Sequence, residues 1–517
     1  MPRKPTPLFN ALACFALVHL TGFARSETYF VVPASTPNHT AVYPYTSWET
    51  AATNIADAVA VTEEDKTVMD TVYLTNGIHY ITTPVSTEDN RITIKSWDGN
   101  PETTIINGNY PANQTRAFHV LAKHRGPAYI EGLAFTNCHS TATGGAIYFR
   151  GASNGAISNC WFLGNVAAER GGAINLERAG FIKNCRFVGN ASNEGGAVGV
   201  TADVQTSMPL SGQPAVIDCV FSNNMSCKNG GAAISGAHGY LVSRCTFVDN
   251  VVSNTVTAYG GAIALGHGGT VHASLITGTK KLNTGYVRGV AVASPNNRNN
   301  SLLDCRIEKN AGGESAVHFL DGLSTIVENC TILDNTNNVA AVAGSMVMRN
   351  TLVARNANVG FLSGNPVSDS WGSILENCTI TANGTFGYQL MGNTLTNQLV
   401  NCIVQGNAPG DQWKRPQVSP GPAFLVENSC LSPLPSGGDV VVNDAVITTD
   451  PAFKNPAAGD YRLRGTSPCR NSGANALPWL ADARDLGGSN PRILEDVVDM
   501  GCYEYFNEHP CTVVTIR

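Results

Sequence analysis

The chain has 517 residues, of which 43% are hydrophobic and only 14% are charged, and its formal net charge is -6. This weakly acidic balance argues against a nucleic-acid partner. The length could hold several globular domains, but the internal repeat described below favours one elongated domain.

Residues 1–24 have the composition of a secretory signal peptide. Arg3 and Lys4 precede an apolar run from Leu8 to Leu20, and a small-residue exit follows at Gly22-Phe23-Ala24 or Ala24-Arg25-Ser26. Such a run is too short for a stable membrane anchor, and no later segment is apolar enough to cross a bilayer. The sequence therefore predicts a secreted or cell-surface protein without a transmembrane segment after signal removal.

The next stretch, residues 25–125, is predicted to form an N-terminal cap and the first irregular coils. Apolar residues recur at spacings of four, three and four, which is typical of an amphipathic helix: Trp48, Ala52, Ile55 and Val59. Ser47 is available as its N-cap. Short strands are then expected at 72–74, 92–95, 104–106 and 118–120.

Residues 171–190 contain the repeat that organises the rest of the chain. Ile174 and Leu176 alternate with polar residues, as in a half-buried strand. The inward phase then shifts by one position at Asn184, after which Cys185 and Phe187 point inward. A residue in the left-handed conformation makes this shift, and Asn tolerates that conformation well. Asn184 is thus a predicted corner, and one unit is predicted to hold three short strands.

The predicted corner returns twelve times, from residue 132 to residue 428, with an average step of about 27 residues. Its positions are Gly132, Asn159, Asn184, Asp218, Arg244, Ala273, Asp304, Asn329, Asn350, Asn377, Asn401 and Asn428. A propeller blade needs more residues than this unit has. The fold class predicted for residues 126–435 is therefore all-β: a right-handed parallel β-helix of about 12 coils or more.

Eight of the 15 cysteines directly follow a corner and share one inward column. Side chains in such a column point in parallel directions, so we expect mostly free, buried thiols that act as small fillers. Cys469, Cys502 and Cys511 lie outside the column and are better candidates for a disulfide. A straight column also offers no tetrahedral metal cluster.

Two motifs recur in these units: Gly-Gly-Ala-Ile/Val, beginning at Gly144, Gly171, Gly195 and Gly260, and Phe-x-x-Asn, beginning at Phe162, Phe187, Phe221 and Phe247. They resemble the repeats of polymorphic outer membrane proteins and, more broadly, bacterial surface proteins of the pectin-lyase-like β-helix superfamily. Residues 436–517 contain Asp450-Pro451-Ala452-Phe453 and Gly501-Cys502-Tyr503-Glu504, and they are similar to the choice-of-anchor Q module. The resemblance implies a surface protein whose C-terminal module caps the rod or serves in anchoring. Enzymes that cleave polysaccharides also belong to this superfamily.

The outward strand positions hold no carboxylate pair of the kind that glycoside hydrolysis needs. Beside the Gly-Gly-Ala motif they are Tyr148, Asn175, Gly199, Ser235, Ala264, Ala291 and His318; on a second face they are Trp161, Arg186, Val220, Thr246, Arg306, Thr331 and Thr379. Glu328, Arg349 and Glu376 are expected to stack as a structural charge ladder. We therefore favour a non-catalytic, monomeric rod for adhesion or for binding a polysaccharide or another cell-surface ligand.

The alternative is a polysaccharide lyase or hydrolase whose site lies in loops after the Gly-Gly-Ala strand. Its candidate residues are Glu177, Arg178, Asp203 and His267. Glu177 or Asp203 could hold Ca²⁺, and Arg178 or His267 could act as the base of a lyase. The competing interpretation is that all four are solvated turn residues, and no other cofactor is expected. A structural spacer of an envelope layer is a third possibility.

Overall fold

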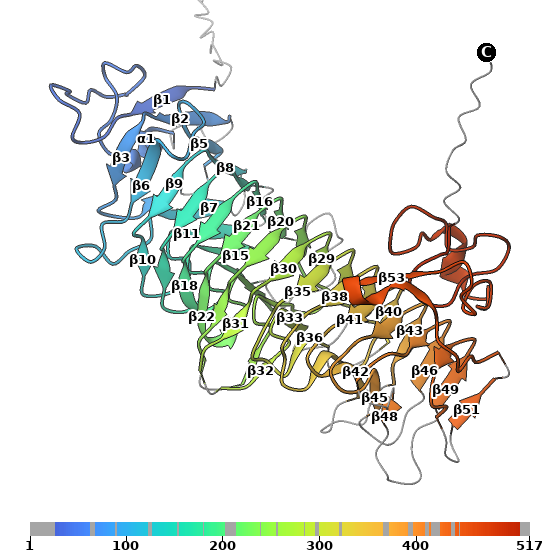
Figure 1. Cartoon of the computed structure of the whole chain (residues 1–517). Coiled ribbons are helices and arrows are strands. Elements are labelled where there is room, and N and C mark those ends of the chain that lie inside the picture. The colour runs from blue at the N-terminus through green and yellow to red at the C-terminus, as the bar shows by residue number, and fades with distance from the viewer. Residues whose placement is uncertain are drawn as a thin grey trace, which may run out of the picture.

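A computed structural model describes residues 26–506 except 63–67, 88–89, 123–126, 152–154, 179, 202–213, 238, 255–256, 284, 295–298, 320–322, 365–371, 391–396, 409–412, 415–423, 436–439 and 444. Short strands stack coil upon coil into a long parallel solenoid (Figure 1). This confirms the predicted all-β, parallel β-helix fold. The predicted signal peptide, Asp203 and Cys511 lie outside the described residues.

Each coil runs through three long sheets, which we call A, B and C, in that order along the chain. Sheet A contains β1 (Thr28–Val31), β2 (Asp70–Leu74), β5 (Ile92–Ser96), β8 (Ala128–Glu131), β12 (Ala156–Ser158), β16 (Phe181–Lys183), β20 (Ala215–Ile217), β24 (Leu241–Ser243), β29 (Thr270–His272), β34 (Ser301–Leu303), β37 (Ile326–Glu328), β40 (Val347–Arg349), β43 (Ile374–Glu376), β46 (Asn397–Val400), β49 (Phe424–Glu427) and β51 (Val440–Val442).

Sheet B contains β3 (Gly77–Tyr80), β6 (Thr104–Asn107), β9 (Ala134–Thr136), β13 (Trp161–Leu163), β17 (Arg186–Val188), β21 (Val220–Ser222), β25 (Thr246–Val248), β30 (Leu275–Thr277), β35 (Arg306–Glu308), β38 (Thr331–Leu333), β41 (Leu352–Ala354), β44 (Thr379–Thr381), β47 (Ile403–Val404) and β50 (Cys430–Leu431).

Sheet C contains β4 (Val85–Ser86), β7 (Phe118–Ala122), β11 (Ile147–Gly151), β15 (Ile174–Arg178), β19 (Val198–Thr201), β23 (Ile234–Gly236), β28 (Ile263–Ala264), β33 (Val292–Ser294), β36 (Ser315–Phe319), β39 (Ala340–Gly344), β42 (Val359–Ser363), β45 (Tyr388–Leu390) and β48 (Trp413–Lys414).

A fourth sheet, D, modifies the predicted three-strand coil in the N-terminal half. It contains β10 (His139–Ser140), β14 (Val166–Ala167), β18 (Ala191–Glu194), β22 (Met225–Gly230), β26 (Val251–Val252) and β31 (Lys280–Lys281). Farther along, β27 (Ala258–Tyr259) and β32 (Val287–Arg288) form a separate pair before sheet C. Residues between sheets B and C, such as Ala191–Glu194, are therefore extended enough to pair between coils.

The corners between sheets A and B follow the sequence prediction. All twelve predicted corner residues have positive φ, for example 54° at Asn184 and 70° at Gly132. The Gly-Gly motif forms another tight turn, between sheets D and C. Gly171 has a φ of 63°, and a Cβ atom on Gly172 would overlap the carbonyl of Gly196 in the next coil. Glycine is required there because the coils approach so closely.

The N-terminal helix is shorter than the periodicity predicted. Helix α1 spans Ile55–Val61, and its N-cap is Asn54, whose side chain accepts a hydrogen bond from the Ala56 amide. The residues before the helix instead contact β1. Ala52 forms a parallel bridge with Val31, and the centroid of the Trp48 ring lies 4.4 Å from that of Phe30. Backbone pairing with β1 thus replaced the first predicted turns. The four strands predicted next are confirmed within β2, β5, β6 and β7.

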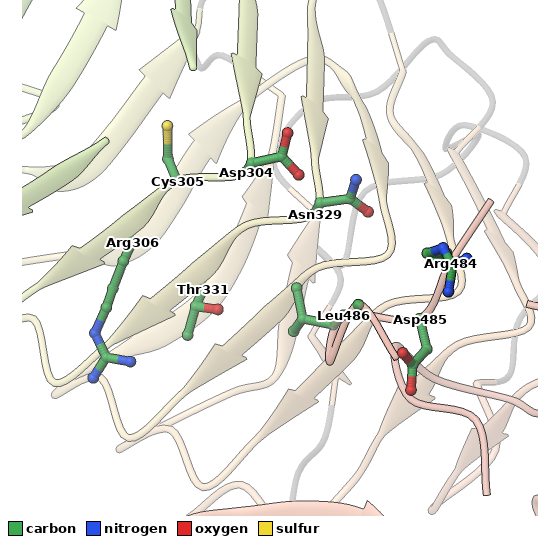
Figure 2. A pocket seen from close by; sticks show the side chains of 9 residues that line it. Asp304, Cys305, Arg306, Asn329, Thr331, Arg484, Asp485 and Leu486 are labelled. Carbon is green, nitrogen blue, oxygen red and sulfur yellow. The ribbon is translucent and has the colours of Figure 1, made fainter. Parts of the chain in front are cut away.

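The described residues 452–506, which we call the C-terminal module, pack against the side of the last coils (Figure 1). Their antiparallel pair, β52 (Phe453–Asn455) and β53 (Asp460–Leu463), joins a buried cluster with the outer face of sheet B. Corner asparagines donate side-chain hydrogen bonds to carbonyls of the module: Asn350 to Arg484, Asn377 to Asp499, Asn401 to Ala474 and Asn428 to Ser472. The loop 484–488 lies beside the corners of neighbouring coils (Figure 2).

Two ladders fill the interior. The rings of Phe135, Phe162, Phe187, Phe221 and Phe247 stack with centroid separations of 4.6–5.0 Å. Buried asparagines of the Phe-x-x-Asn motif bond from coil to coil; for example, the Asn190 side-chain oxygen accepts from the Asn165 amide at 2.9 Å. These bonds satisfy backbone groups that the turn leaves unpaired inside the rod.

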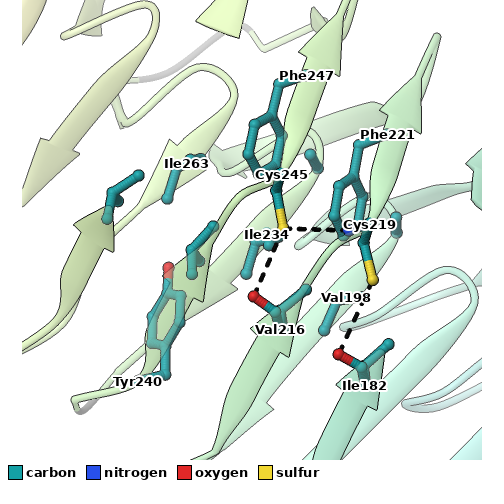
Figure 3. Packing of buried hydrophobic residues seen from close by; sticks show 14 of the residues in the cluster. Ile182, Val198, Val216, Cys219, Phe221, Ile234, Tyr240, Cys245, Phe247 and Ile263 are labelled. Carbon is teal, nitrogen blue, oxygen red and sulfur yellow. Dashed lines mark hydrogen bonds between the residues drawn. The ribbon is translucent and has the colours of Figure 1, made fainter. Parts of the chain in front are cut away.

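The cysteine column is buried, as predicted, and it also accepts hydrogen bonds. The Cys219 amide donates to the sulfur of Cys245 at 3.5 Å, and the Cys245 amide donates to the hydroxyl of Ser274 at 3.1 Å. Figure 3 shows the Cys219 and Cys245 sulfurs also bonding to carbonyls of neighbouring coils. The column therefore selects small side chains that can accept an N–H, which explains why Ser or Thr replaces Cys in some coils.

Among the described residues, no helix is long and apolar enough to cross a membrane.

Candidate functional site

The outer face of sheet C carries the residues that follow the Gly-Gly-Ala turns. Of these, His119 and Tyr148 are half-buried, whereas Asn175, Ser235 and His318 are buried. Its central column, set by strand register, is His119, Tyr148, Asn175, Gly199, Ser235, Ala264, Ala293 and His318. The sequence assignment of Ala291 to this column was wrong. Val290-Ala291 belongs to the turn, and Val292 is the inward residue that pairs with Ile263. A run of alternating Val and Ala left that register ambiguous.

One polar cluster, the Tyr148 cluster, consists of Arg116, His119, Tyr148, Arg150 and Glu177. The Tyr148 ring stacks on that of His119 at 5.2 Å, and the Arg116 guanidinium lies 4.9 Å from its centroid. The Tyr148 hydroxyl donates to the Glu177 carboxylate, which also lies 3.3 Å from Arg150 Nε. Parallel pairing of β7, β11 and β15 brings these side chains together.

The electrostatics leave this cluster net positive. It contains two guanidinium groups and one carboxylate, and the Arg150 side chain is 44% exposed whereas that of Glu177 is 20% exposed. Burial, then the hydrogen bond to Glu177, raise the pKa of Tyr148 to about 12, so its hydroxyl stays protonated at neutral pH. The cluster can therefore offer the solvent-facing Arg150 guanidinium to an anionic group, while the Tyr148 hydroxyl uses its one proton to hold Glu177 in place.

The structure places the four predicted site residues as follows. Glu177 and Arg178 belong to strand β15 itself, and Glu177 is engaged by Tyr148 and Arg150. His267 is exposed just after β28, three coil steps from β15, or roughly 14 Å along the rod. The described residues thus do not bring Glu177 and His267 together.

Calcium binding by Glu177 and Asp203 stays a hypothesis, because Asp203 is outside the described residues. In the part of the chain that the structure describes, no three His, Cys, Asp or Glu side chains are grouped so as to hold a metal ion.

A second cluster, the His318 cluster, was not predicted as a unit. It consists of Tyr259, Tyr286, Arg288, Glu314 and His318. The Arg288 guanidinium lies 5.5 Å and 5.9 Å from the two tyrosine rings. Glu314 Oε2 is 3.6 Å from Arg288 Nε and 3.8 Å from His318 Nδ1.

A sequence signal for this cluster exists. Tyr259, Arg288 and Glu314 each directly precede a turn into sheet C, and so do Arg170 and Glu194, which form an ion pair at 2.9 Å. These five residues precede turns into sheet C beside the central column, and four of them are charged: Arg170, Glu194, Arg288 and Glu314.

His318 is held neutral. Its side chain is buried, and burial followed by repulsion from Arg288 lowers its pKa to about 3. The Ser315 hydroxyl is 3.3 Å from His318 Nδ1, the same nitrogen that faces Glu314. A nucleophilic triad needs its base to contact the serine and the carboxylate through different nitrogens, so this trio lacks that arrangement.

The two clusters lie far apart on one face. Six strand steps separate Tyr148 from His318, or roughly 29 Å, and the column between them includes Gly199, Ser235, Ala264 and Ala293. Glu177 and Glu314 are five steps apart, roughly 24 Å, whereas a glycosidase needs carboxylates about 5–9.5 Å apart. These two residues therefore do not form a hydrolytic pair.

The predicted charge ladder on sheet A is confirmed. Arg349 Nε lies 2.7 Å from Glu376 and Arg349 Nη1 lies 4.0 Å from Glu328. Its guanidinium also packs 5.6 Å from the ring of Trp479 in the C-terminal module, which supports a structural role.

The stacked coils and their two polar clusters define a parallel β-solenoid with one chemically distinct face. More specifically, the chain belongs to the right-handed β-helix family, whose model, "Right handed beta helix region", matches residues 92–277 and 276–410. No curated protein sequence matches the chain significantly.

Solved structures similar to this chain include three carbohydrate-active enzymes. Pectate lyase Pel9A is 13% identical over 94% of this chain and 98% of its own, with a TM-score of 0.31. A GH87 alpha-1,3-glucanase from Streptomyces thermodiastaticus is 13% identical over 76% and 66%, with a TM-score of 0.37. A mannuronic acid specific family 6 lyase from human gut microbiota is 11% identical over 78% and 86%, with a TM-score of 0.39. Likeness at this level carries no argument about activity.

Proposed function

We propose that this protein is an exported β-helix that binds an acidic polysaccharide along the outer face of sheet C without cleaving it. The observation that carries the proposal is the placement of Tyr148 between Arg116 and Arg150. Cationic side chains on both sides of an oriented phenol can bind the carboxylate or sulfate of a sugar residue. Because the net charge of the whole chain is negative, an acidic ligand would bind through the local positive charge of the Tyr148 cluster.

The repeat itself supports an extended ligand. Neighbouring coils repeat the strand positions about every 4.8 Å, so a polymer lying along the rod follows that spacing. Its polar contact would be at the Tyr148 cluster, because Asn175 and Ser235 in the next coils are buried. The Tyr148 cluster contains one carboxylate, Glu177, which is already engaged by Arg150 and the Tyr148 hydroxyl. This arrangement favours binding over two-carboxylate hydrolysis.

A polysaccharide lyase is the second candidate, and the Tyr148–Glu177 hydrogen bond is the observation that favours it. In such an enzyme Arg150 would neutralise a uronate carboxylate, and the protonated Tyr148 would donate a proton to the leaving oxygen. Arg178 remains the candidate base and Ca²⁺ a candidate cofactor, whereas His267, just after a strand four steps from that of Tyr148, is too distant to act at this site. If the protein is a lyase, it must release unsaturated sugar products from the polysaccharide.

The test is affinity electrophoresis of the purified protein in gels containing polygalacturonate, alginate, heparin or neutral dextran. Retardation by an acidic polymer that falls severalfold in Arg150→Gln and Tyr148→Phe is expected. Arg186→Gln is the matched control, because Arg186 is an exposed arginine on sheet B that packs on Trp161. Equal retardation of all variants would contradict the proposed site.

The same polymers, incubated with Ca²⁺ or with a chelator, distinguish the two candidates. Unsaturated product formed by the wild type and lost in Tyr148→Phe would replace the binding proposal by the lyase.

We further propose export as a monomeric surface protein, as the N-terminal segment and the polymorphic-outer-membrane-protein-like repeats suggest. Cell fractionation and light scattering of the purified protein test these two points.

A further inference from the structure

A cleft lies where the C-terminal module meets the rod, away from sheet C. Its volume is about 430 Å³. Two neighbouring coils and the loop 484–488 line it (Figure 2): Asp304, Cys305, Arg306, Asn329, Thr331, Arg484, Asp485, Leu486 and Gly488. This volume is in the range of small-ligand sites, about 300–1,000 Å³.

Both walls of the cleft are held in place. On the rod, Asp304 and Asn329 are corner residues with φ of 54° and 55°, and Arg306 pairs in register with Thr331. On the module, the Arg484 carbonyl accepts a hydrogen bond from the Asn350 side chain at 2.8 Å, and the Leu486 amide donates to the Cys502 carbonyl at 2.9 Å. The polar groups are therefore preorganised.

The charges in the cleft balance, and each has a neighbour. Asp304 lies 3.2 Å from His272 Nε2, and Arg306 lies 2.6 Å from Glu308. Arg484 donates to the Ser489 carbonyl at 3.2 Å. The buried Asp485 carboxylate accepts from the amides of Asn490 and Glu504 at 3.3 and 3.4 Å. The cleft thus has two carboxylates and two guanidinium groups, so its net charge is close to zero and it attracts an ionic ligand only weakly.

We propose that this junction cleft binds a neutral sugar residue. Carboxylate and amide oxygens accept hydrogen bonds from hydroxyl groups, and guanidinium and threonine hydroxyl groups donate to them. Leu486 supplies one apolar contact for the C–H face of a ring. The lining combines donors and acceptors at fixed positions without excess charge, which suits a polyhydroxyl ligand better than an ion or an apolar molecule.

The site also joins two parts of the chain. Asp304, Asn329 and Thr331 come from the rod, whereas Arg484 and Leu486 come from the module. A bound sugar would therefore contact both and stabilise their docking, because a ligand that binds only the docked form favours that form.

The test is calorimetric titration of the full-length purified protein with cello-, xylo-, manno- and malto-oligosaccharides, and with oligogalacturonate. One neutral series is expected to bind, with at least a tenfold weaker affinity in Arg484→Ala and in Asp304→Ala. Asp218→Ala is the matched control for the second variant, because Asp218 is also a positive-φ corner with an ion-pair partner, Arg244 at 2.7 Å, outside the cleft.

The outcomes separate this site from the one on sheet C. Tyr148→Phe should leave neutral-sugar binding unchanged, and equal thermal midpoints of Asp304→Ala and Asp218→Ala would show that lost affinity is not lost folding. No binding of any neutral series, binding of oligogalacturonate alone, or full affinity in both cleft variants would each overturn the proposal.

Discussion

The buried asparagine ladder makes a quantitative prediction at Asn224. Its side-chain oxygen accepts from the amide and side-chain nitrogens of Asn190, both at 3.0 Å, and its own side-chain nitrogen donates to the Phe187 carbonyl at 3.1 Å and to Asn250 at 3.0 Å. Asn224→Ala leaves the Asn190 amide unpaired, which costs about 1–3 kcal/mol, and removes further bonds worth about 0.5–1.5 kcal/mol each. With the three further bonds counted, the expected loss is about 2.5–7.5 kcal/mol.

Guanidinium unfolding followed by intrinsic fluorescence measures this loss as a lower midpoint at unchanged slope. Ser222→Ala, on the outer face of the same coil, is the control and should change stability by no more than about 0.5 kcal/mol. Asn224→Asp tests the donor role, since a carboxylate cannot donate to Phe187 or Asn250; it should be at least as destabilising at neutral pH. If Asn224→Ala and Ser222→Ala unfold at the same guanidinium concentration, the asparagine ladder does not stabilise the rod.

Three further predictions concern other contacts. Because His318 has a folded pKa near 3, below the unfolded value of about 6.5, its contribution to stability is present above pH 6.5 and falls by about 1.4 kcal/mol per pH unit below it; His318→Gln should flatten that part of a stability-against-pH curve. Phe187→Ala opens the aromatic stack and should cost about 3–5 kcal/mol in denaturant unfolding. Asn401→Ala removes both side-chain bonds to Ala474 and should make the C-terminal module more sensitive to limited proteolysis, while an unchanged cleavage rate would argue against this docking contact.

The sequence alone determined the solenoid because its signals are local. Period-two alternation identified the strands, and the single-residue phase shift at positions such as Asn184 identified corners that do adopt positive φ. The shared spacing of cysteines and phenylalanines then aligned the coils. The sequence could not show that the cysteine sulfurs accept amide hydrogen bonds from the adjoining coil, because those bonds depend on how the coils stack.

Only the tertiary structure decided which polar side chains meet. The steps between corners vary from 21 to 34 residues, so spacing along the chain does not say that Arg116 lies over Tyr148 or that Arg288 reaches Glu314. Nor did it show that the C-terminal module folds back onto sheet B and encloses a cleft with Asp304. Strand pattern depends on neighbours in sequence, whereas a site depends on neighbours across coils, which loop lengths and docking determine.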